Sequence, residues 1–509
     1  MANGTKFGGP GEKPVQQGNV EGMNPMEISR QKVWDVKMVI DGKLVESSDG
    51  RVHEVRSPID GRLVGRIPIA SKEDMERAVQ AAYKAKDAVR DMTTSDRAKA
   101  LTTVARLIRG NVDDLSRLVV LETGKPIDIA RPTLERVAEN LIYIGEEGKR
   151  ITGEVVQCDA FSGVPKSKIG LVTKEPIGVV LAIGPFNYPE YTNMRKVAPA
   201  LAAGNSVILK PSEFAPLTVT QICSYFLQTD LPAGAVNVIN CPGRDLEHVI
   251  DHPHINAITF TGSSKVGKRI AQSTGLKKLV MELGGKSPLV VLEDADMKDA
   301  VENAVDGAFI MSGQRCDAVS RVLVVESVKD EFLRMAVQRA KEKMKPGNPL
   351  ESGVNFGPLI TEDAAKRVEG YVADAVKKGA KVVLGGKRRG NFFEPTILDG
   401  VTENMLIAQE EYFGPVMPIM TVKDFDDAIA VTNRNAYGLQ AAIFTKDVNR
   451  VMNGARRLEV GTVVLNTRPK VYDNLPVTGV KDSGVGSEGI RYAIDELTIR
   501  KTLLMDIKG

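Results

Sequence analysis

The chain has 509 residues, 42% of them hydrophobic and 26% charged, which is typical of a globular enzyme with two or three domains. Its formal net charge is only +3, with basic and acidic residues interspersed, so a nucleic-acid partner is not indicated. The longest apolar runs, such as 178–183, are too short to cross a bilayer, and the amino terminus lacks a signal-peptide core. We therefore expect a cytoplasmic protein with no membrane partner that acts on a small molecule.

Residues 1–30 are rich in Gly, Pro, Gln and Asn without periodicity, and are predicted to form a disordered arm. Short apolar alternations broken by Asp-Gly pairs between residues 37 and 69 predict hairpin strands. Ser71, followed by acidic residues, predicts the N-cap of an alanine-rich amphipathic helix that ends near Val89. Further helices are predicted at 94–109, 113–122 and 132–149.

Buried strands are predicted at 178–183, 206–209, 236–239 and 256–260. Because helical or turn segments separate them, the pattern predicts an α/β fold with a doubly wound parallel sheet, which binds ligands beyond its carboxyl ends. The turn Thr261–Gly267 follows a strand and opens a helix, as a phosphate site requires, although its spacing alone is more typical of a plain turn. After residue 294 the alternation continues and predicts a second α/β layer, and the tail 498–505 is predicted to be a strand.

The chain has four cysteines: Cys158, Cys223, Cys241 and Cys316. None belongs to a C-x-x-C pair, so neither a disulfide framework nor a zinc site is indicated. His252 and His254 form an H-x-H pair without a second ligand cluster, and we interpret it as part of a solvated loop. No metal is expected.

Cys316, in the segment Phe309–Ala318, is the candidate nucleophile. A single cysteine is more often a small buried hydrophobe, but the adjacent Arg315 is expected to lower its pKa. Glu282 follows an apolar run and precedes two glycines, which makes it a candidate general base for water. Asn187 lies in a polar turn after a buried strand and is a candidate donor to an oxyanion.

Six segments occur in the order and spacing of the aldehyde dehydrogenase superfamily, which the sequence resembles. They are Pro185–Pro189 (PFNYP), Leu209–Glu213 (LKPSE), Phe260–Ser263 (FTGS), Met281–Gly285 (MELGG), Gly313–Cys316 (GQRC) and Glu411–Pro415 (EYFGP). Within the superfamily the chain is most similar to the non-phosphorylating glyceraldehyde-3-phosphate dehydrogenases, particularly the archaeal ones.

This resemblance implies that the cofactor is NADP or NAD. The implied contacts are Lys210 and Glu213 with the adenosine ribose, Gly262, Ser263 and Gly267 around the pyrophosphate, Glu411 with the nicotinamide ribose, and Phe413 beside the nicotinamide. Glu213 favours NAD because it would repel a 2′-phosphate, whereas Lys210 and Lys265 favour NADP. The subfamily resemblance leans toward NADP.

The resemblance also implies a phosphate-binding set that includes Arg136, Tyr188 and Arg315, all suitable donors to a dianion. Without the resemblance, Arg136 would be interpreted as a solvated surface charge. A fourth member falls within 466–470, where the sequence departs from the better-known enzymes, and either Arg468 or Lys470 is a candidate.

The same resemblance implies the domain organisation. Residues 31–149 and 172–283 would form the NAD(P)-binding domain, 284–480 the catalytic domain, and 150–171 with 481–509 a small β flap that joins subunits into a homotetramer.

The implied reaction begins with attack of the Cys316 thiolate on an aldehyde, with Asn187 and the Cys316 backbone N–H stabilising the oxyanion. After hydride transfer, Glu282 would activate water to hydrolyse the thioester. The favoured reaction is oxidation of D-glyceraldehyde 3-phosphate to 3-phosphoglycerate without inorganic phosphate. Alternatives are a dehydrogenase for another small aldehyde, such as lactaldehyde or succinic semialdehyde, and a non-catalytic ligand-binding relative.

Overall fold

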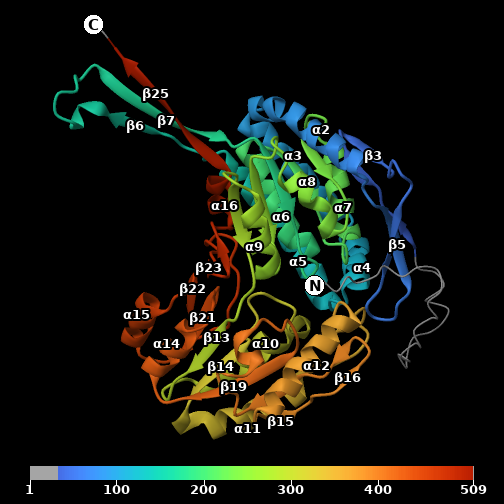
Figure 1. Cartoon of the computed structure of the whole chain (residues 1–509), viewed down its shortest axis with the longest axis vertical. Coiled ribbons are helices and arrows are strands. Elements are labelled where there is room, and N and C mark those ends of the chain that lie inside the picture. Colours follow the sequence, from blue (N-terminus) through green and yellow to red (C-terminus); the bar gives the residue numbers. More distant parts are fainter. Residues whose placement is uncertain (1–31, 508–509) are drawn as a thin grey trace.

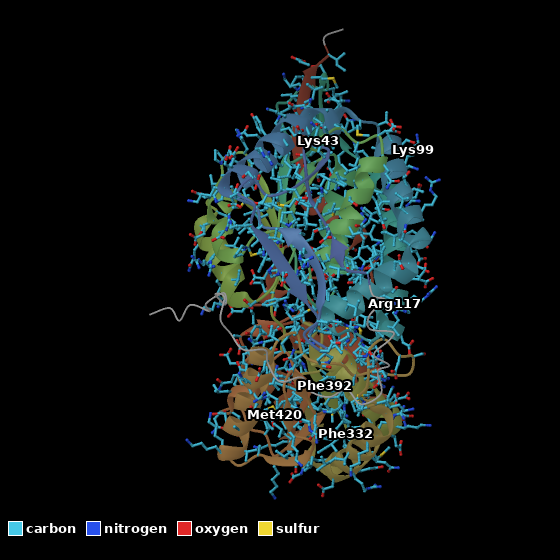
Figure 2. The ribbon with its side chains drawn as sticks, turned by 90° about the vertical axis from the view of Figure 1, so that its right-hand side faces the viewer. Lys43, Lys99, Arg117, Phe332, Phe392 and Met420 are labelled. Atoms are coloured by element: carbon cyan, nitrogen blue, oxygen red, sulfur yellow. The ribbon has the colours of Figure 1, made fainter. Side chains whose placement is uncertain are left out.

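Two large sheets, one above the other, organise the chain in the computed structural model, which describes residues 32–507 (Figure 1). The predicted arm at residues 1–30 lies outside the described residues. Lys43, Lys99 and Arg117 belong to the upper body and Phe332, Phe392 and Met420 to the lower one (Figure 2). Within residues 32–507, no helix has both the length and the apolar character needed to cross a membrane.

The first sheet has eight strands in the order β24-β12-β11-β8-β9-β10-β2-β3. Their bounds are β2 Met38–Ile40, β3 Lys43–Val45, β8 Val179–Ile183, β9 Ser206–Lys210, β10 Val236–Val238, β11 Ala257–Thr261, β12 Lys278–Glu282 and β24 Gly484–Val485. The five central strands, β10 to β12 in sheet order, run parallel. Their carboxyl ends bring Lys210, Thr261 and Glu282 to one edge of the sheet.

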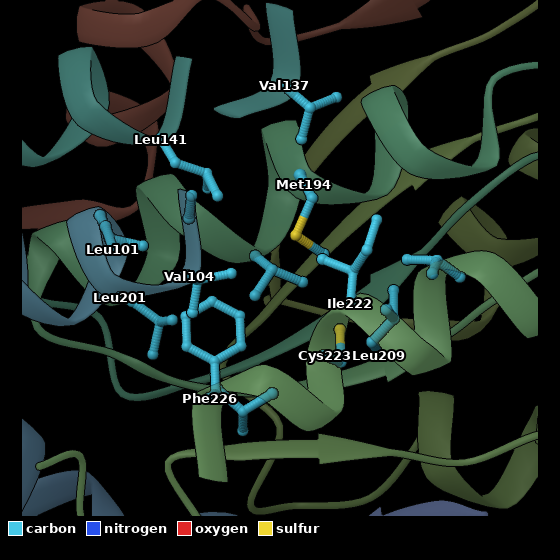
Figure 3. Packing of buried hydrophobic residues seen from close by; sticks show 14 of the residues in the cluster. Leu101, Val104, Val137, Leu141, Met194, Leu201, Leu209, Ile222, Cys223 and Phe226 are labelled. Carbon is cyan, nitrogen blue, oxygen red and sulfur yellow. The ribbon is translucent and has the colours of Figure 1, made fainter. Parts of the chain in front are cut away.

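Both faces of this sheet are covered by helices, which explains why its strands are continuous apolar runs. Val180, Ala182 and Leu209 face one hydrophobic cluster, whereas Leu181 and Ile208 face another. The helices in this half are α2 Lys72–Asp91, α3 Thr94–Gly110, α4 Val112–Thr123, α5 Ile127–Gly148, α6 Pro189–Ala203, α7 Leu217–Ser224, α8 Glu247–Ile250, α9 Ser264–Ser273 and α16 Ile490–Glu496. Figure 3 shows side chains of α3, α5, α6 and α7 interdigitating above β9.

Local signals were confirmed at several points in this half. Ser71 caps α2 in a reciprocal capping box with Asp74. Asp41 and Gly42, with φ of 54° and 71°, form the tight turn between β2 and β3, as the Asp-Gly pair predicted. One helix start was wrong: α5 begins at Ile127, and Pro132 lies inside it. Pro132 lacks an N–H and so removes one helical hydrogen bond. The helix continues through it because α5 packs against α3, α4 and α6.

The second sheet has seven strands in the order β15-β18-β19-β14-β13-β21-β22, all parallel except β15. Their bounds are β13 Pro288–Val291, β14 Arg321–Val325, β15 Lys381–Leu384, β18 Thr396–Asp399, β19 Val416–Val422, β21 Gln440–Phe444 and β22 Thr462–Leu465. The helices around it are α10 Met297–Phe309, α11 Lys329–Lys343, α12 Glu362–Lys377, α13 Leu406–Gln409, α14 Phe425–Asn433 and α15 Val448–Arg457. The predicted α/β class with mainly parallel sheets is therefore confirmed.

A three-stranded antiparallel arm projects from the upper body (Figure 1). It consists of β6 Glu154–Gln157, β7 Lys168–Pro176 and β25 Thr498–Asp506, with β7 in the middle. A smaller sheet near the start of the chain contains β1 Trp34–Asp35, β4 Val52–Arg56 and β5 Leu63–Pro68. Short two-stranded pairs complete the fold: β16 Arg388–Arg389 with β17 Phe392–Phe393, and β20 Tyr437–Gly438 with β23 Val480–Lys481.

Candidate active site

The segment that carries Cys316 follows α10 as a strained turn. Helix α10 ends at Phe309, and Met311 and Ser312 adopt left-handed φ values of 56° and 55°. This conformation costs roughly 1–2 kcal/mol for each non-glycine residue. Gly313 continues it at φ 69°, where a Cβ would lie 2.0 Å from the carbonyl oxygen of Gly414, so only glycine fits.

Side chains of this turn bind a second segment, residues 357–360. The Ser312 hydroxyl donates a 2.6 Å hydrogen bond to the carbonyl of Gly357. The Gln314 amide spans the same segment, accepting from the N–H of Ile360 at 2.9 Å and donating to the carbonyl of Pro358 at 3.3 Å. These bonds offset the backbone strain and fix the start of the segment that contains Cys316.

Asn187 and the 283–287 loop reach the same place from the first sheet. Asn187 lies between β8 and α6, is buried, and donates from Nδ2 to the carbonyl of Gln314 at 2.9 Å. A Cβ at Gly285 would lie 2.2 Å from the carbonyl oxygen of Cys316, so the loop after β12 touches the cysteine backbone. The structure therefore brings Cys316, Asn187 and the loop after Glu282 together between the two sheets.

Glu282, the last residue of β12, is buried, and its Oε1 has no hydrogen-bond partner within residues 32–507. Burial and the nearby charge of Glu488 raise the pKa of this carboxyl well above its usual value, while Lys196 and Arg195 oppose the shift. A buried carboxyl with a raised pKa and a free oxygen is suited to accept a proton.

The sequence interpretation missed the ion pair beside Glu282. Lys196 of α6 and Glu488 form a buried salt bridge, and the Lys196 ammonium also donates to the Thr259 hydroxyl at 3.3 Å. One signal was present, since a lysine in a helix that is buried almost throughout requires a partner. Glu488, 292 residues further along the chain, could not be identified as that partner.

The expectation of a lowered Cys316 pKa is wrong, although Arg315 does act in the expected direction. Burial, followed by the charges of Asp317, Glu282 and Glu411, raises the pKa of the thiol well above its usual value, and Arg315 only partly opposes this. The Arg315 guanidinium donates to the Gly307 carbonyl at 2.6 Å and lies 3.5 Å from the Asp317 carboxylate. The Asp317 charge raises the thiol pKa and so opposes the effect of Arg315.

Predicted cofactor residues line the carboxyl edge of the first sheet. Lys210 ends β9 and is buried, and Ser263 caps α9 by accepting the N–H of Val266. A Cβ at Gly267 would lie 2.4 Å from the Leu283 side chain, so α9 packs closely on the strand ends. Gly262 donates to the Glu282 carbonyl at 3.1 Å. The amino end of α9 therefore presents backbone N–H groups at this edge, as a pyrophosphate requires.

Glu411 and Phe413 approach from the second sheet. Glu411 accepts the N–H of Gly285 at 3.0 Å, and burial raises its pKa to about 7. The Phe413 ring meets Phe186 edge-on at 5.9 Å. Phe186 in turn meets Phe214, the neighbour of Glu213, at 6.1 Å. The three rings therefore form a row between the segments that carry Glu213 and Glu411.

Tyr188, Arg315 and Arg468 converge beside Cys316. Gly307 of α10 lies between the two arginines, because its carbonyl accepts from Arg315 and its Cβ position would be 3.5 Å from the Arg468 Cβ. Burial, and then the charge of Arg315, lower the pKa of Arg468. Burial raises the pKa of the Tyr188 hydroxyl, and the charges of both arginines partly oppose this shift. Lys470 is exposed, with its ammonium 5.2 Å from the Tyr472 ring.

Two other candidates lie apart from this group. The Arg136 guanidinium binds the Asp473 carboxylate at 2.5 Å and the Val471 carbonyl at 2.9 Å. The His254 ring stacks on Tyr83 at 3.7 Å, and His252 lies 3.5 Å from Glu76.

Comparisons with known proteins agree with this geometry. The sequence profile of the "Aldehyde dehydrogenase family" matches residues 44–503. An NADP-dependent glyceraldehyde-3-phosphate dehydrogenase of Streptococcus equinus is 38% identical over 89% of this chain and 95% of its own. A lactaldehyde dehydrogenase of Methanococcus aeolicus is 35% identical over 92% of this chain and 100% of its own.

Among solved structures, NADP-dependent glyceraldehyde-3-phosphate dehydrogenase from Bacillus halodurans, complexed with NADP, superposes with a TM-score of 0.91. It is 37% identical, and the match covers 93% of this chain and 100% of that one. The arrangement of the two sheets is thus the aldehyde dehydrogenase fold, and the chain belongs to the aldehyde dehydrogenase family.

Proposed function

We propose that this aldehyde dehydrogenase oxidises D-glyceraldehyde 3-phosphate to 3-phosphoglycerate with NADP or NAD and without inorganic phosphate. The observation that carries the proposal is the convergence of Tyr188, Arg315 and Arg468 beside Cys316. Two guanidiniums and a phenol hydroxyl in one buried place suit a phosphate dianion. The similarity to two enzymes named for this substrate supports it.

In the proposed reaction the Cys316 thiol loses its proton and its sulfur attacks the aldehyde carbon. The oxyanion that forms is stabilised by the Asn187 amide and the backbone N–H of Cys316. Because the thiol pKa is raised, the ionised form must be stabilised as the substrate and cofactor arrange around it, and the thiol proton leaves to solvent.

The residues at the carboxyl edge of the first sheet fit a dinucleotide. The capped amino end of α9 would receive the pyrophosphate, Lys210 and Glu213 the adenosine ribose, and Glu411, with Phe413 beside it, the nicotinamide end. When bound, the cofactor supplies the hydride acceptor. The buried Lys210 ammonium favours NADP and the Glu213 carboxylate favours NAD; we propose NADP because the two glyceraldehyde-3-phosphate relatives are named for it.

Glu282 then activates water to hydrolyse the thioester. Its unpartnered Oε1 can accept a proton from water, and the Lys196–Glu488 pair behind it sets the local charge. Hydrolysis releases the free acid, so no inorganic phosphate takes part.

We also propose the domain roles implied by the sequence, with 31–149 and 172–283 binding the cofactor and 284–480 carrying the nucleophile. The flap predicted at 150–171 and 481–509 would join subunits into a homotetramer through the arm strands β6, β7 and β25, whereas β24 and α16 lie in the half that contains the first sheet. Exposed apolar side chains on the arm support an interface there, including Val155, Phe161, Leu503 and Leu504 at 65%, 79%, 56% and 59% exposure.

A second candidate function is oxidation of an unphosphorylated or carboxylated aldehyde, such as lactaldehyde or succinic semialdehyde, with Arg315 and Arg468 binding a carboxylate. The similarity to the lactaldehyde dehydrogenase favours this candidate. A non-catalytic relative is the third, and the convergence of Cys316 with Asn187 argues against it.

Initial rates with D-glyceraldehyde 3-phosphate, unphosphorylated glyceraldehyde, lactaldehyde and succinic semialdehyde test the proposal. We expect kcat/KM for the phosphorylated aldehyde to exceed the others by about a hundredfold, since two charge-assisted contacts would be lost. Equal or higher kcat/KM for an unphosphorylated aldehyde would contradict the substrate assignment. Absence of NAD(P)H formation with every aldehyde would support the non-catalytic candidate.

A further inference from the structure

The segment 466–476, which carries Arg468, is tied to helices of the first sheet through Asp473. The Asp473 Oδ2 accepts a 2.5 Å hydrogen bond from Arg136 Nε of α5, and its Oδ1 accepts from the Tyr191 hydroxyl of α6. Arg195 Nε, also on α6, lies 3.9 Å from the same carboxylate. Only 12% of the Asp473 side chain is exposed, so these contacts are largely shielded from water.

Further contacts hold the same segment in one position. Arg136 donates from Nη2 to the Val471 carbonyl at 2.9 Å, and the Asp473 carbonyl accepts the N–H of Ile490 at 2.9 Å. Both guanidiniums also lie near the Tyr191 ring, with Arg136 Cζ at 5.0 Å and Arg195 Cζ at 5.3 Å from its centroid. Without the Asp473 charge, Arg136 would lose the carboxylate it binds, and Arg195 would keep only the nearby charges of Glu488 and Glu282.

This cluster adjoins the candidate substrate group. The Tyr191 ring meets the Tyr188 ring edge-on at 6.1 Å, and Tyr188 is influenced by the charges of Arg315 and Arg468. Arg468 precedes Asp473 by five residues in the same segment. The Arg468 N–H is itself held by Asn303 Oδ1 of α10 at 2.9 Å, so Asp473 fixes the other end of the short segment that carries Arg468.

We propose that Asp473 is a positioning residue, which latches segment 466–476 to α5 and α6 and so holds Arg468 where it selects an anionic aldehyde. Arg136 contributes to this latch through its contact with Asp473. The selection of an anionic aldehyde rests on the proposed function, whereas the latch does not.

The test uses Asp473→Asn, Arg136→Gln and the double variant in the full chain. Asparagine preserves the size of the side chain and its contact with Tyr191, while removing the charge. Asn474→Ala, at the exposed neighbouring position, is the matched control. Two quantities are measured: hydrogen exchange of the amides in 466–476 by peptide mass spectrometry, and kcat and KM with phosphorylated and unphosphorylated glyceraldehyde.

We expect Asp473→Asn to accelerate exchange in 466–476 by about tenfold and to raise KM for the phosphorylated aldehyde by about tenfold. The kcat for the phosphorylated aldehyde should change less than about twofold, as should kcat and KM for the unphosphorylated aldehyde. The reason is that the substitution leaves Cys316 and the contacts that fix its segment unchanged. Because the two residues act as one contact, the double variant should match the more affected single variant. Asn474→Ala should resemble the wild type.

Unchanged exchange in Asp473→Asn, or additive effects in the double variant, would overturn the latch. A lower KM for the phosphorylated aldehyde would also overturn it, because Asp473 would then compete with substrate for Arg136. If the wild type does not prefer the phosphorylated aldehyde, the proposed function fails. The exchange measurements and the double variant still decide the latch in that case.

Discussion

The side-chain amide of Asn187 donates a 2.9 Å hydrogen bond to the backbone carbonyl of Gln314, two residues before Cys316. Asn187 follows β8 of the first sheet, and Gln314 lies in the turn between α10 and β14 of the second, so this bond joins the two halves next to Cys316. In the reaction proposed above, the same amide would stabilise an oxyanion formed on Cys316.

Replacing Asn187 by Ala should therefore lower kcat by about 10²–10³-fold, the usual cost of losing an oxyanion donor. Cofactor affinity, measured by fluorescence quenching, should remain within about twofold because the sheet edge is unchanged. A kcat close to that of the wild type would show that Asn187 has only a structural role.

The raised pKa of Cys316 predicts slow alkylation of the free enzyme at neutral pH. The form of Cys316 that reacts with an alkylating reagent is the thiolate. The fraction of thiolate falls as the pH decreases below the thiol pKa. The rate of Cys316 modification by iodoacetamide, followed by mass spectrometry, should keep rising up to about pH 9. A rate that is already constant between about pH 6 and 8 would mean that the thiol is acidic in the free enzyme.

The KM for the cofactor should also depend on pH, through the ionisation of Glu411. Its pKa of about 7 means that the carboxylate form, which accepts hydrogen bonds from ribose hydroxyls, predominates above this pH and is lost below it. The KM for the cofactor should therefore rise as pH falls from about 8 to 6. Glu411→Gln should have a raised KM that no longer depends on pH in this range. The same pH dependence in this variant would exclude Glu411 as its cause.

Arg468 and Lys470 can be separated by substitution. Arg468 is partly buried and lies near Arg315, whereas Lys470 is exposed, so the two glutamine variants should differ. Arg468→Gln should lower kcat/KM for D-glyceraldehyde 3-phosphate by about 10–100-fold, as expected for loss of a charge-assisted contact. Lys470→Gln should change it less than about threefold. The reverse order would assign the phosphate to Lys470.

Elements with strong local signals could be predicted from the sequence. The parallel strands β8, β9, β10 and β11 appeared as short apolar runs because both faces of their sheet are buried. The capping of α2 by Ser71 and the Asp-Gly turn after β2 depend on neighbouring residues only, and both were confirmed.

Relationships between distant residues could not be predicted in this way. Arg136 meets Asp473 across 337 residues, and Lys196 meets Glu488 across 292, so no local pattern indicates either pair. The pKa of Cys316 was predicted in the wrong direction for the same reason. Arg315 is adjacent in sequence, but the decisive contributions are burial and acidic residues that the fold brings close.

In the proposed reaction, Cys316 forms a thioester that is hydrolysed by water activated by Glu282. Both steps are tested by rapid mixing of Glu282→Gln with D-glyceraldehyde 3-phosphate and NADP in phosphate-free buffer, with NADPH absorbance as the signal and Cys316→Ala as the control. We predict a burst of one NADPH per site, followed by a steady rate about 10²–10⁴-fold below that of the wild type, and no burst in Cys316→Ala. A steady rate equal to that of the wild type, or a burst without Cys316, would contradict the account.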